Sequence, residues 1–427
     1  SLLSCAKINF ICIQAIEVKV KLKKIRELFQ ATDMTSGEPW KQIVRFTIPM
    51  LIGNIAQQLY NTVDSIVVGQ YVGDNALAAV GSAMPILNLL LVLFIGISMG
   101  ASIMVAQYFG AKQREDLSYT VGNCILLTAI ATGVIMILSV FLVRPLLEVL
   151  NTPASIIDWC HSYLMIMFLG VVGCAYYNIL SGVLRGLGDA FSALIYLLVS
   201  TVLNIVLDIL FVAQFGMGVS GVAWATVIAQ TVSAALCFIR LTKMTDLFDI
   251  KLHYIKWNGK YAGKIIRLGL PSGLTQAIFS MAMIVVQSLT NSFGEMFISA
   301  NVIVMRVDGF AMLPNFSFGT AMTTYAGQNV GARAYDRVKK GAKQGTLVAV
   351  MTTAVLTGLI LIFGKQLMGI FTKTSELVEL SRNMMNIIAA GYVAMAVTQS
   401  LSGVMRGAGD TMTPMWISLF TTIIAIE

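Results

Sequence analysis

Long stretches without charge constrain this chain more than any other feature of its sequence. Asp, Glu, Lys and Arg make up only 12% of its residues, against about 25% in an average soluble domain. Charge-free runs recur at 75–111, 117–143, 159–184, 209–239, 268–294, 309–332, 344–364 and 383–405. A helix needs about 20 mostly apolar residues to cross a bilayer, so each run is long enough to span a membrane. The sequence therefore predicts an all-α integral membrane protein.

The basic residues test this interpretation, because Lys and Arg concentrate in cytoplasmic loops. We expect spans at roughly 46–68, 76–109, 119–143, 162–184, 191–213, 219–239, 268–290, 298–328, 344–363, 384–404 and from 412 onward. With the N-terminus inside, the cytoplasmic segments carry 24 basic residues and the outer loops carry 4. This segregation predicts a multi-pass protein with a cytoplasmic N-terminus. It also accounts for the net charge of +8 without a nucleic acid partner.

A ten-residue motif occurs twice in the chain. LSGVLRGLGD at 180–189 and LSGVMRGAGD at 401–410 are identical at eight of ten positions, with an offset of 221. The same offset relates VAQYFGAK at 105–112 to AGQNVGAR at 326–333. Two homologous halves of six spans each are parallel, because an even number of spans returns the chain to the same side. Such repeats are typical of transporters that rock two lobes about a central cavity.

The repeat also predicts the domain organisation. Residues 37–240 form a first six-helix lobe, 241–267 a basic cytoplasmic linker, and 268–427 a second lobe. By the repeat offset, the eleventh helix is cut short and the twelfth lies beyond Glu427. Residues 1–36 precede the first lobe as an N-terminal extension. Met34 suits a natural start, so we expect residues 1–33 to lie upstream of the original protein. The alternative is a basic helix lying on the membrane surface.

Within the repeated motif, each residue type suits a tight turn between two helices. The Arg-Gly pairs at 185–186 and 406–407 are expected to end one helix, with the cation complementing the helix dipole. The glycines of these pairs suit a C-terminal cap. Asp189 and Asp410 suit the N-cap of the helix that follows.

Several motifs together resemble the multidrug and toxic compound extrusion (MATE) family. They are LYNTVDSIVVGQYVG at 59–73, AQYFGAK at 106–112, LSGVLRGLGD at 180–189 and NIVLD at 204–208. The resemblance extends from about residue 37 to residue 427. It implies twelve helices in two lobes, and a monomer in the bacterial cytoplasmic membrane. It further implies export of small organic cations and amphipathic compounds by antiport with H⁺ or Na⁺, with no cofactor beyond this coupling ion.

Charged residues inside the predicted spans are few. Asp64, Asp208 and Asp308 are the only acidic residues within complete spans. An ionisable group at bilayer depth is costly, so each is a functional candidate. Asn204 lies four residues before Asp208, so the two share one helix face. Their carboxylate and amide oxygens are ligands that a small cation prefers.

The resemblance assigns an ion site to this half. In the family, a first-helix Asp, an Asn and an Asp of the fifth helix and a sixth-helix Thr form it; here these positions are Asp64, Asn204, Asp208 and Thr226. A proton or Na⁺ would neutralise the pocket and favour one packing of the lobes, and a cationic drug would favour the other. Pro49 would let the first helix bend. The alternative is that both aspartates are hydrogen-bonded structural residues.

The second half offers different cavity candidates. One branch of the family carries a glutamate on the seventh helix, where this chain has only Gln276 and Gln287. Arg306 and Asp308 lie two residues apart, so they point to different sides of their helix. Asp308 could face the cavity and attract cations, or the two residues could hold the lobe together through buried pairing. The sequence leaves both interpretations open.

Other classes of protein find less support. His161 and His253 lack the spacing of a metal site, and the absence of a GxxxxGK[ST] loop argues against an ATP-driven pump. The loops also lack an aspartate-rich metal motif such as a membrane prenyltransferase would need, so we do not expect an enzyme. A flippase for lipid-linked sugars or peptidoglycan precursors shares the architecture. Its pyrophosphate substrates call for a cationic cavity, whereas complete spans here hold three Asp and one Arg. An ion channel would need a continuous polar pore.

Overall fold

The computed structural model describes residues 31–150 and 152–426, and all regular elements in these ranges are helical. The first half contains α2 (Pro39–Val67), the π-helical η1 (Val68–Val72), α3 (Asp74–Gly110), α4 (Arg114–Val149), α5 (Ile157–Leu169), α6 (Val171–Gly186), α7 (Ala190–Asp208), the π-helical η2 (Ile209–Gln214) and α8 (Gly218–Thr242). The second contains α9 (Gly259–Asn291), α10 (Glu295–Ala311), α11 (Leu313–Gly331), α12 (Tyr335–Ile362), α13 (Gly364–Gly369), α14 (Ser375–Ala408) and α15 (Met412–Ile426). The prediction for residues 1–33 falls almost entirely outside the described residues.

Membrane-spanning length and apolar composition recur along the chain, as predicted. Eight of the described helices are long and apolar enough to cross a membrane, and the pair α5–α6, bent by 50°, makes a possible ninth. The first helix, α2, is 29 residues long but more polar. It carries amides and a carboxyl group, and it packs on α7 of its own half and on α11 and α12 of the other.

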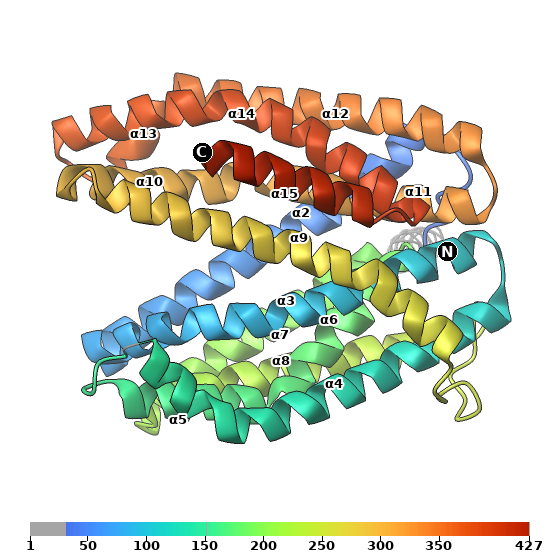
Figure 1. Ribbon diagram of the computed structural model, residues 1–427, viewed down its shortest axis with the longest axis horizontal. Coiled ribbons are helices and arrows are strands. Elements are labelled where there is room, and N and C mark those ends of the chain that lie inside the picture. Colours follow the sequence, from blue (N-terminus) through green and yellow to red (C-terminus); the bar gives the residue numbers. More distant parts are fainter. Residues whose placement is uncertain (1–30, 151, 427) are drawn as a thin grey trace, which may run out of the picture.

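The two halves fold alike, which confirms the predicted two-lobe architecture. In the first lobe α3 packs on α6 and α2 packs on α7; in the second, α11 packs on α14 and α9 packs on α15. Each half also sends its first helix across to the other. Helix α9 packs along α3 and α4, and α2 packs along α11 and α12. Figure 1 shows α2 and α9 running between the upper group of helices, α10–α15, and the lower group, α3–α8.

The repeated motif forms the same turn twice, but its cap glycines are not the predicted ones. Gly186 is the last residue of α6, and Gly407 lies within α14. The left-handed positions come two residues later, at Gly188 with φ 83° and Gly409 with φ 98°. The prediction of a cap at Gly186 and Gly407 is therefore wrong, because only the later glycines adopt the conformation that favours glycine.

Close helix packing explains the earlier glycine of each pair. A Cβ at Gly186 would lie 2.7 Å from the carbonyl oxygen of Ser102 on α3. A Cβ at Gly407 would collide with the carbonyl oxygen of Thr323 on α11. Ser102 and Thr323 are themselves related by the repeat offset of 221. The motif thus occurs twice because each lobe contains the same close contact between two helices.

The N-caps predicted in the same motif are confirmed. The Asp189 carboxylate accepts a hydrogen bond from the backbone N–H of Ser192 at 3.0 Å, and that of Asp410 accepts one from Thr413 at 3.0 Å. Asp189 also forms a salt bridge with Arg240 at 3.0 Å. The two caps therefore differ, because one is buried and ion-paired and the other is exposed.

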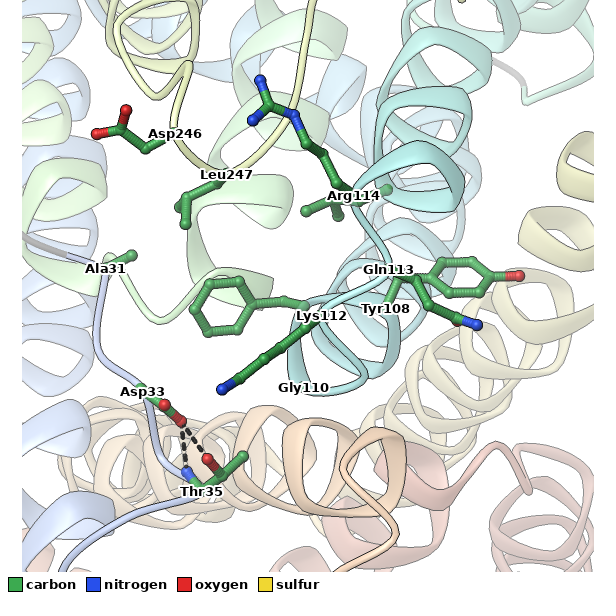
Figure 2. A pocket seen from close by; sticks show the side chains of 12 residues that line it. Ala31, Asp33, Thr35, Tyr108, Gly110, Lys112, Gln113, Arg114, Asp246 and Leu247 are labelled. Atoms are coloured by element: carbon green, nitrogen blue, oxygen red, sulfur yellow. Dashed lines mark hydrogen bonds between the residues drawn. The ribbon is translucent and has the colours of Figure 1, made fainter.

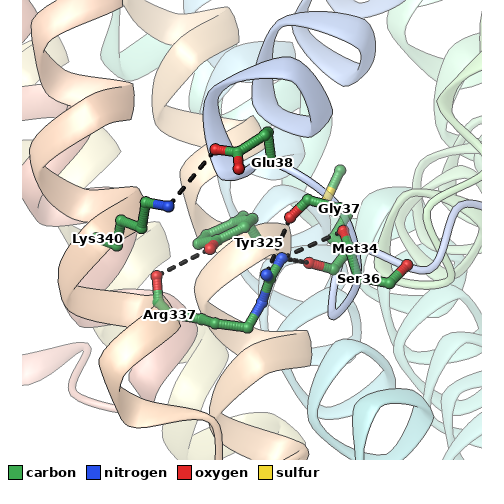
Figure 3. A network of polar contacts seen from close by, with 7 residues as sticks. All are labelled: Met34, Ser36, Gly37, Glu38, Tyr325, Arg337 and Lys340. Atoms are coloured by element: carbon green, nitrogen blue, oxygen red, sulfur yellow. Dashed lines mark hydrogen bonds and ion pairs between the residues drawn. The ribbon is translucent and has the colours of Figure 1, made fainter.

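We call the side of the molecule where residues 243–258 connect α8 to α9 the linker end. Here the segment before α2 is tied to the second lobe, as Figure 3 shows. The Arg337 guanidinium donates to the carbonyl oxygens of Gly37, Met34 and Ser36 at 2.9, 3.1 and 3.2 Å. The backbone N–H of Met34 donates to Gln328 at 2.9 Å. These contacts hold the two lobes together at this end.

A cavity of about 460 Å³ lies at the linker end, between the α3–α4 turn, the segment before α2 and the loop after α8. Figure 2 shows its charged side chains, Lys112 and Arg114 on one side and Asp33 and Asp246 on the other. Arg114 is held by Asp249 at 3.2 Å. The cavity contains none of the predicted site residues.

Candidate functional site

The four residues of the predicted ion site come together in the first lobe. Asp64 comes from α2, Asn204 and Asp208 from α7, and Thr226 from α8. Asp64 is 7% exposed, Asn204 1% and Asp208 0%. The two carboxyl groups interact electrostatically with each other. Residues up to 162 positions apart in the chain therefore share one buried pocket.

Thr226 connects the side chains of the pocket. Its hydroxyl oxygen accepts a hydrogen bond from Tyr60 at 3.1 Å and one from the amide of Asn204 at 3.5 Å. Tyr60 precedes Asp64 by one helical turn on α2. Sequence reasoning missed Tyr60, although its spacing of four residues from Asp64 was a usable signal.

Tyr163 is a second residue that sequence reasoning missed. It is buried on α5 and interacts electrostatically with both Asp64 and Asp208. Its helix contributes none of the predicted residues, so no spacing in the sequence pointed to it. The pocket is therefore built by four helices, α2, α5, α7 and α8.

Four buried oxygen atoms of the pocket lack hydrogen-bond partners among the described residues. They are Oδ1 of Asp64, Oδ1 of Asn204 and both carboxylate oxygens of Asp208. No salt bridge between described residues includes either aspartate. Buried acceptors without partners are costly. The arrangement can therefore accept a proton or a small cation, either of which would satisfy these oxygens.

Both aspartates lie beside a π-helical segment. Asp208 is the last residue of α7 before η2, and η1 begins four residues after Asp64. Such wide turns occur frequently at functional sites. The regular α-helical hydrogen bonding of α2 and α7 therefore gives way to wider π-helical turns just beyond each carboxylate.

Pro49 lies within α2, on the linker-end side of Asp64, and the helix continues through it without a break. The side chain lines a cavity of about 180 Å³ together with Asn54, Asn178 and Arg185. This cavity shares Asn54, Asn178 and Arg185 with a neighbouring one of about 200 Å³. The predicted bending residue therefore lies on a cavity wall rather than in the carboxylate pocket.

A third cavity, of about 380 Å³, lies next to these two. It shares Ile95, Met99 and Thr320 with the 200 Å³ cavity, so these two adjoin and are lined by residues of both halves, whereas the 180 Å³ cavity is lined by the first half alone. We call the three adjoining cavities together the central cavity. Gln276, a predicted cavity residue, lines its largest part, and so does Arg406.

The remaining candidates of the second lobe lie apart from one another. The Asp308 carboxyl group interacts with the hydroxyl of Tyr392 inside the lobe, and Arg306 is exposed. The salt bridges between described residues do not include Arg306, so the two do not pair. Gln287 is half-buried on α9, next to Val286 of the cavity wall.

A parallel repeat of membrane helices around a central cavity, with a buried carboxylate pair in one lobe, defines an integral membrane protein of transporter type. The MatE family profile matches residues 49–210 and 271–426, once in each half. The chain therefore belongs to the MatE family. It is a multi-pass membrane protein of this family of multidrug efflux transporters.

Individual relatives agree with this assignment. The probable multidrug resistance protein YoeA of Bacillus subtilis is 30% identical over 388 residues, covering 89% of this chain and 84% of that protein. The probable multidrug resistance protein NorM of Thermotoga maritima is 26% identical over 392 residues, covering 89% and 82%. A solved structure described as an outward-facing conformation of a multidrug resistance MATE family transporter has a TM-score of 0.86 at 26% identity, covering 92% and 88%.

Proposed function

We propose that this protein is a secondary active exporter that exchanges organic cations and other amphipathic compounds for H⁺ or Na⁺. Asp64, Asn204, Asp208 and Thr226 form its ion-coupling site. The observation that supports this proposal most strongly is the buried carboxylate pair with oxygens that no described residue satisfies.

Coupling follows from the electrostatics of the pair. Two negative charges side by side in a low-dielectric pocket repel each other strongly. One proton shared between them, or one Na⁺ bound to their oxygens, removes this repulsion. Because Asp64 belongs to α2 and Asp208 to α7, occupancy of the pocket changes how tightly these helices pack. An ion that stabilises one packing shifts the population of the two lobe arrangements.

The orientation of the protein in the membrane follows from the placement of charge. The linker end carries the basic segments, so it is the cytoplasmic side by the positive-inside rule. Gln107 and Gln328 each donate a hydrogen bond across the two lobes at this end, and the structure is then a state closed toward the cytoplasm. A protein of this kind acts in the bacterial cytoplasmic membrane, and one chain contains both lobes, so a monomer suffices.

Ethidium efflux from proteoliposomes containing the full chain tests the coupling. A pH gradient and a Na⁺ gradient are imposed separately on the wild type, D64N and D208N, with D158N as a control because Asp158 is exposed outside the pocket. We expect efflux to follow one gradient and to fall at least about tenfold in both pocket variants, as for a lost charge-assisted interaction. Wild-type rates in D64N and D208N would refute the proposal.

A flippase of lipid-linked pyrophosphates is a second candidate, favoured by one observation. Arg185 and Arg406 line the central cavity. The sequence count of three Asp and one Arg left out both residues, because it covered only charged residues within complete predicted spans. Absence of ethidium efflux under either gradient, with a folded protein in the membrane, would favour this candidate.

A further inference from the structure

The arginine of the repeated motif has the same placement in both lobes. Arg185 lies in the last turn of α6 and Arg406 in the last turn of α14. Both side chains line the central cavity. The Arg185 guanidinium reaches back to the hydroxyls of Ser181 at 3.2 Å and Ser98 at 3.5 Å. The two cations therefore face the space between the lobes from opposite halves of the chain.

Neither cation is neutralised by a carboxylate of the described residues. Salt bridges in these ranges join Arg240 to Asp189, for example, but none includes Arg185 or Arg406. The Nε atom of Arg406 is buried and has no hydrogen-bond partner there. Both residues are half-buried, and a cation held in a cavity without a carboxylate partner is unfavourable, so the pair is suited to an anionic ligand.

The walls around the arginines suit a ligand with a polar head and an apolar body. Neutral hydrogen-bonding groups lie near them, including Asn54 and Asn178 beside Arg185 and Gln399 beside Arg406. The largest part of the cavity also has an apolar wall with Phe279 and Phe316. No Asp or Glu is among the residues that line its three parts. The cavity is therefore positively charged where it is polar.

We propose that Arg185 and Arg406 form an oxyanion-binding site that takes the phosphate or pyrophosphate group of an amphipathic substrate. A guanidinium group presents paired N–H donors that match phosphate oxygens. The apolar wall then holds the hydrocarbon part. This inference deepens the second candidate function above by naming the groups that would hold the anionic head of the substrate, and it does not depend on the exchange of cations.

Equilibrium binding to the purified full chain in detergent tests the site, with farnesyl pyrophosphate as the anionic amphiphile. Farnesol is the matched uncharged probe, and inorganic pyrophosphate tests the head group alone. Microscale thermophoresis measures all three without an ion gradient. Loss of coupling in D64N and loss of anion binding are thus separate results, so failure of one proposal is distinguishable from failure of the other.

We expect farnesyl pyrophosphate to bind at least about tenfold more tightly than farnesol, and R185Q and R406Q each to weaken it about tenfold or more, the scale of a hydrogen bond to a charged group. R406K should restore part of the loss. R144Q is the control, because Arg144 is exposed and paired with Glu148 and Asp158 away from the cavity. Thermal unfolding confirms that each variant is folded.

Two results would overturn the site. One is equal binding of farnesyl pyrophosphate and farnesol to the wild type. The other is unchanged farnesyl pyrophosphate binding in the folded R185Q/R406Q double variant. Arginine-dependent binding of inorganic pyrophosphate as well would support the site and indicate a soluble phosphate source. Binding of the farnesyl compound alone would support it and indicate a lipid source.

Discussion

Gln107 and Gln328 make the same contact in opposite directions across the lobe interface. The amide of Gln107 on α3 donates to the carbonyl oxygen of Gly407 at 3.0 Å. The amide of Gln328 on α11 donates to the carbonyl oxygen of Gly186 at 3.2 Å. Each pair of equivalent residues is related by the offset of 221. The linker end is therefore closed by a reciprocal pair of hydrogen bonds, each to a glycine of the repeated motif.

The first prediction concerns this closure. Replacing Gln107 or Gln328 by Ala removes one interlobe hydrogen bond, worth about 0.5–1.5 kcal/mol. The closed arrangement should then lose about two- to tenfold in population against arrangements open at the linker end. Hydrogen–deuterium exchange of peptides covering 105–112 and 326–333 should rise in each variant, and more in the double variant.

Gln70→Ala is the control for this prediction, because Gln70 is exposed in η1, far along α2 from the linker end. Its exchange in the two peptides should match the wild type. Unchanged exchange in the Gln107→Ala/Gln328→Ala double variant would show that these hydrogen bonds do not hold the lobes together.

The second prediction concerns helix packing. A Cβ at Gly407 would collide with the backbone oxygen of Thr323, which cannot rotate away as a side chain can. Gly407→Ala should therefore force α14 away from α11 and destabilise the protein by about 1–3 kcal/mol. The unfolding temperature in detergent measures this. Gly391→Ala, on the same helix but facing open space, should be neutral or stabilising; equal losses in both would contradict the packing argument.

Much of the fold could be predicted from hydropathy and the repeat. The predicted span at 119–143 lies within α4, and the one at 344–363 extends one residue beyond α12, because long apolar runs leave few alternatives in a membrane. Hydropathy does not predict the breaks inside two spans. Helices α5 and α6 meet at a 50° bend, and α10 gives way to α11 at Met312. The second break carries another signal, because Pro314 lies in the first turn of α11, where proline is favoured.

The site could be predicted only where residue type and spacing identified it. Asp64 and Asp208 stand out as carboxylates in apolar helices, and the structure brings them together. Arg185 and Arg406 were read as charges at helix ends facing the cytoplasm. Their side chains instead turn back into the central cavity, a direction that depends on tertiary packing and cannot be read from the motif.

The third prediction concerns pH. Hydrogen bonds from the backbone and side chain of Thr413 hold the pKa of Asp410 below its usual range. A lowered folded-state pKa means that the cap stabilises the protein at neutral pH and loses this contribution as the pH falls through that value. Asp410→Ala should lower stability by about 0.5–2 kcal/mol at pH 7.

Thermal unfolding between pH 7 and pH 3 measures this difference. The gap between wild type and Asp410→Ala should narrow toward the acid end. Asp410→Asn keeps a capping oxygen without a titrating group, so its difference from Asp410→Ala should stay nearly constant. A wild-type advantage over Asp410→Ala that persists undiminished to pH 3 would mean that the charge of Asp410 contributes nothing.

The fourth prediction concerns Thr226. Its hydroxyl accepts hydrogen bonds from Tyr60 and Asn204, so Thr226→Val leaves two buried donors without a partner, at a cost of about 1–3 kcal/mol each. We expect ion-driven ethidium efflux to fall about tenfold or more, while Thr226→Ser, which keeps the hydroxyl, stays near the wild-type rate. Tyr60→Phe should fall between the two. If Thr226→Val transports like the wild type while D64N does not, Thr226 lies beside the coupling site without taking part in it.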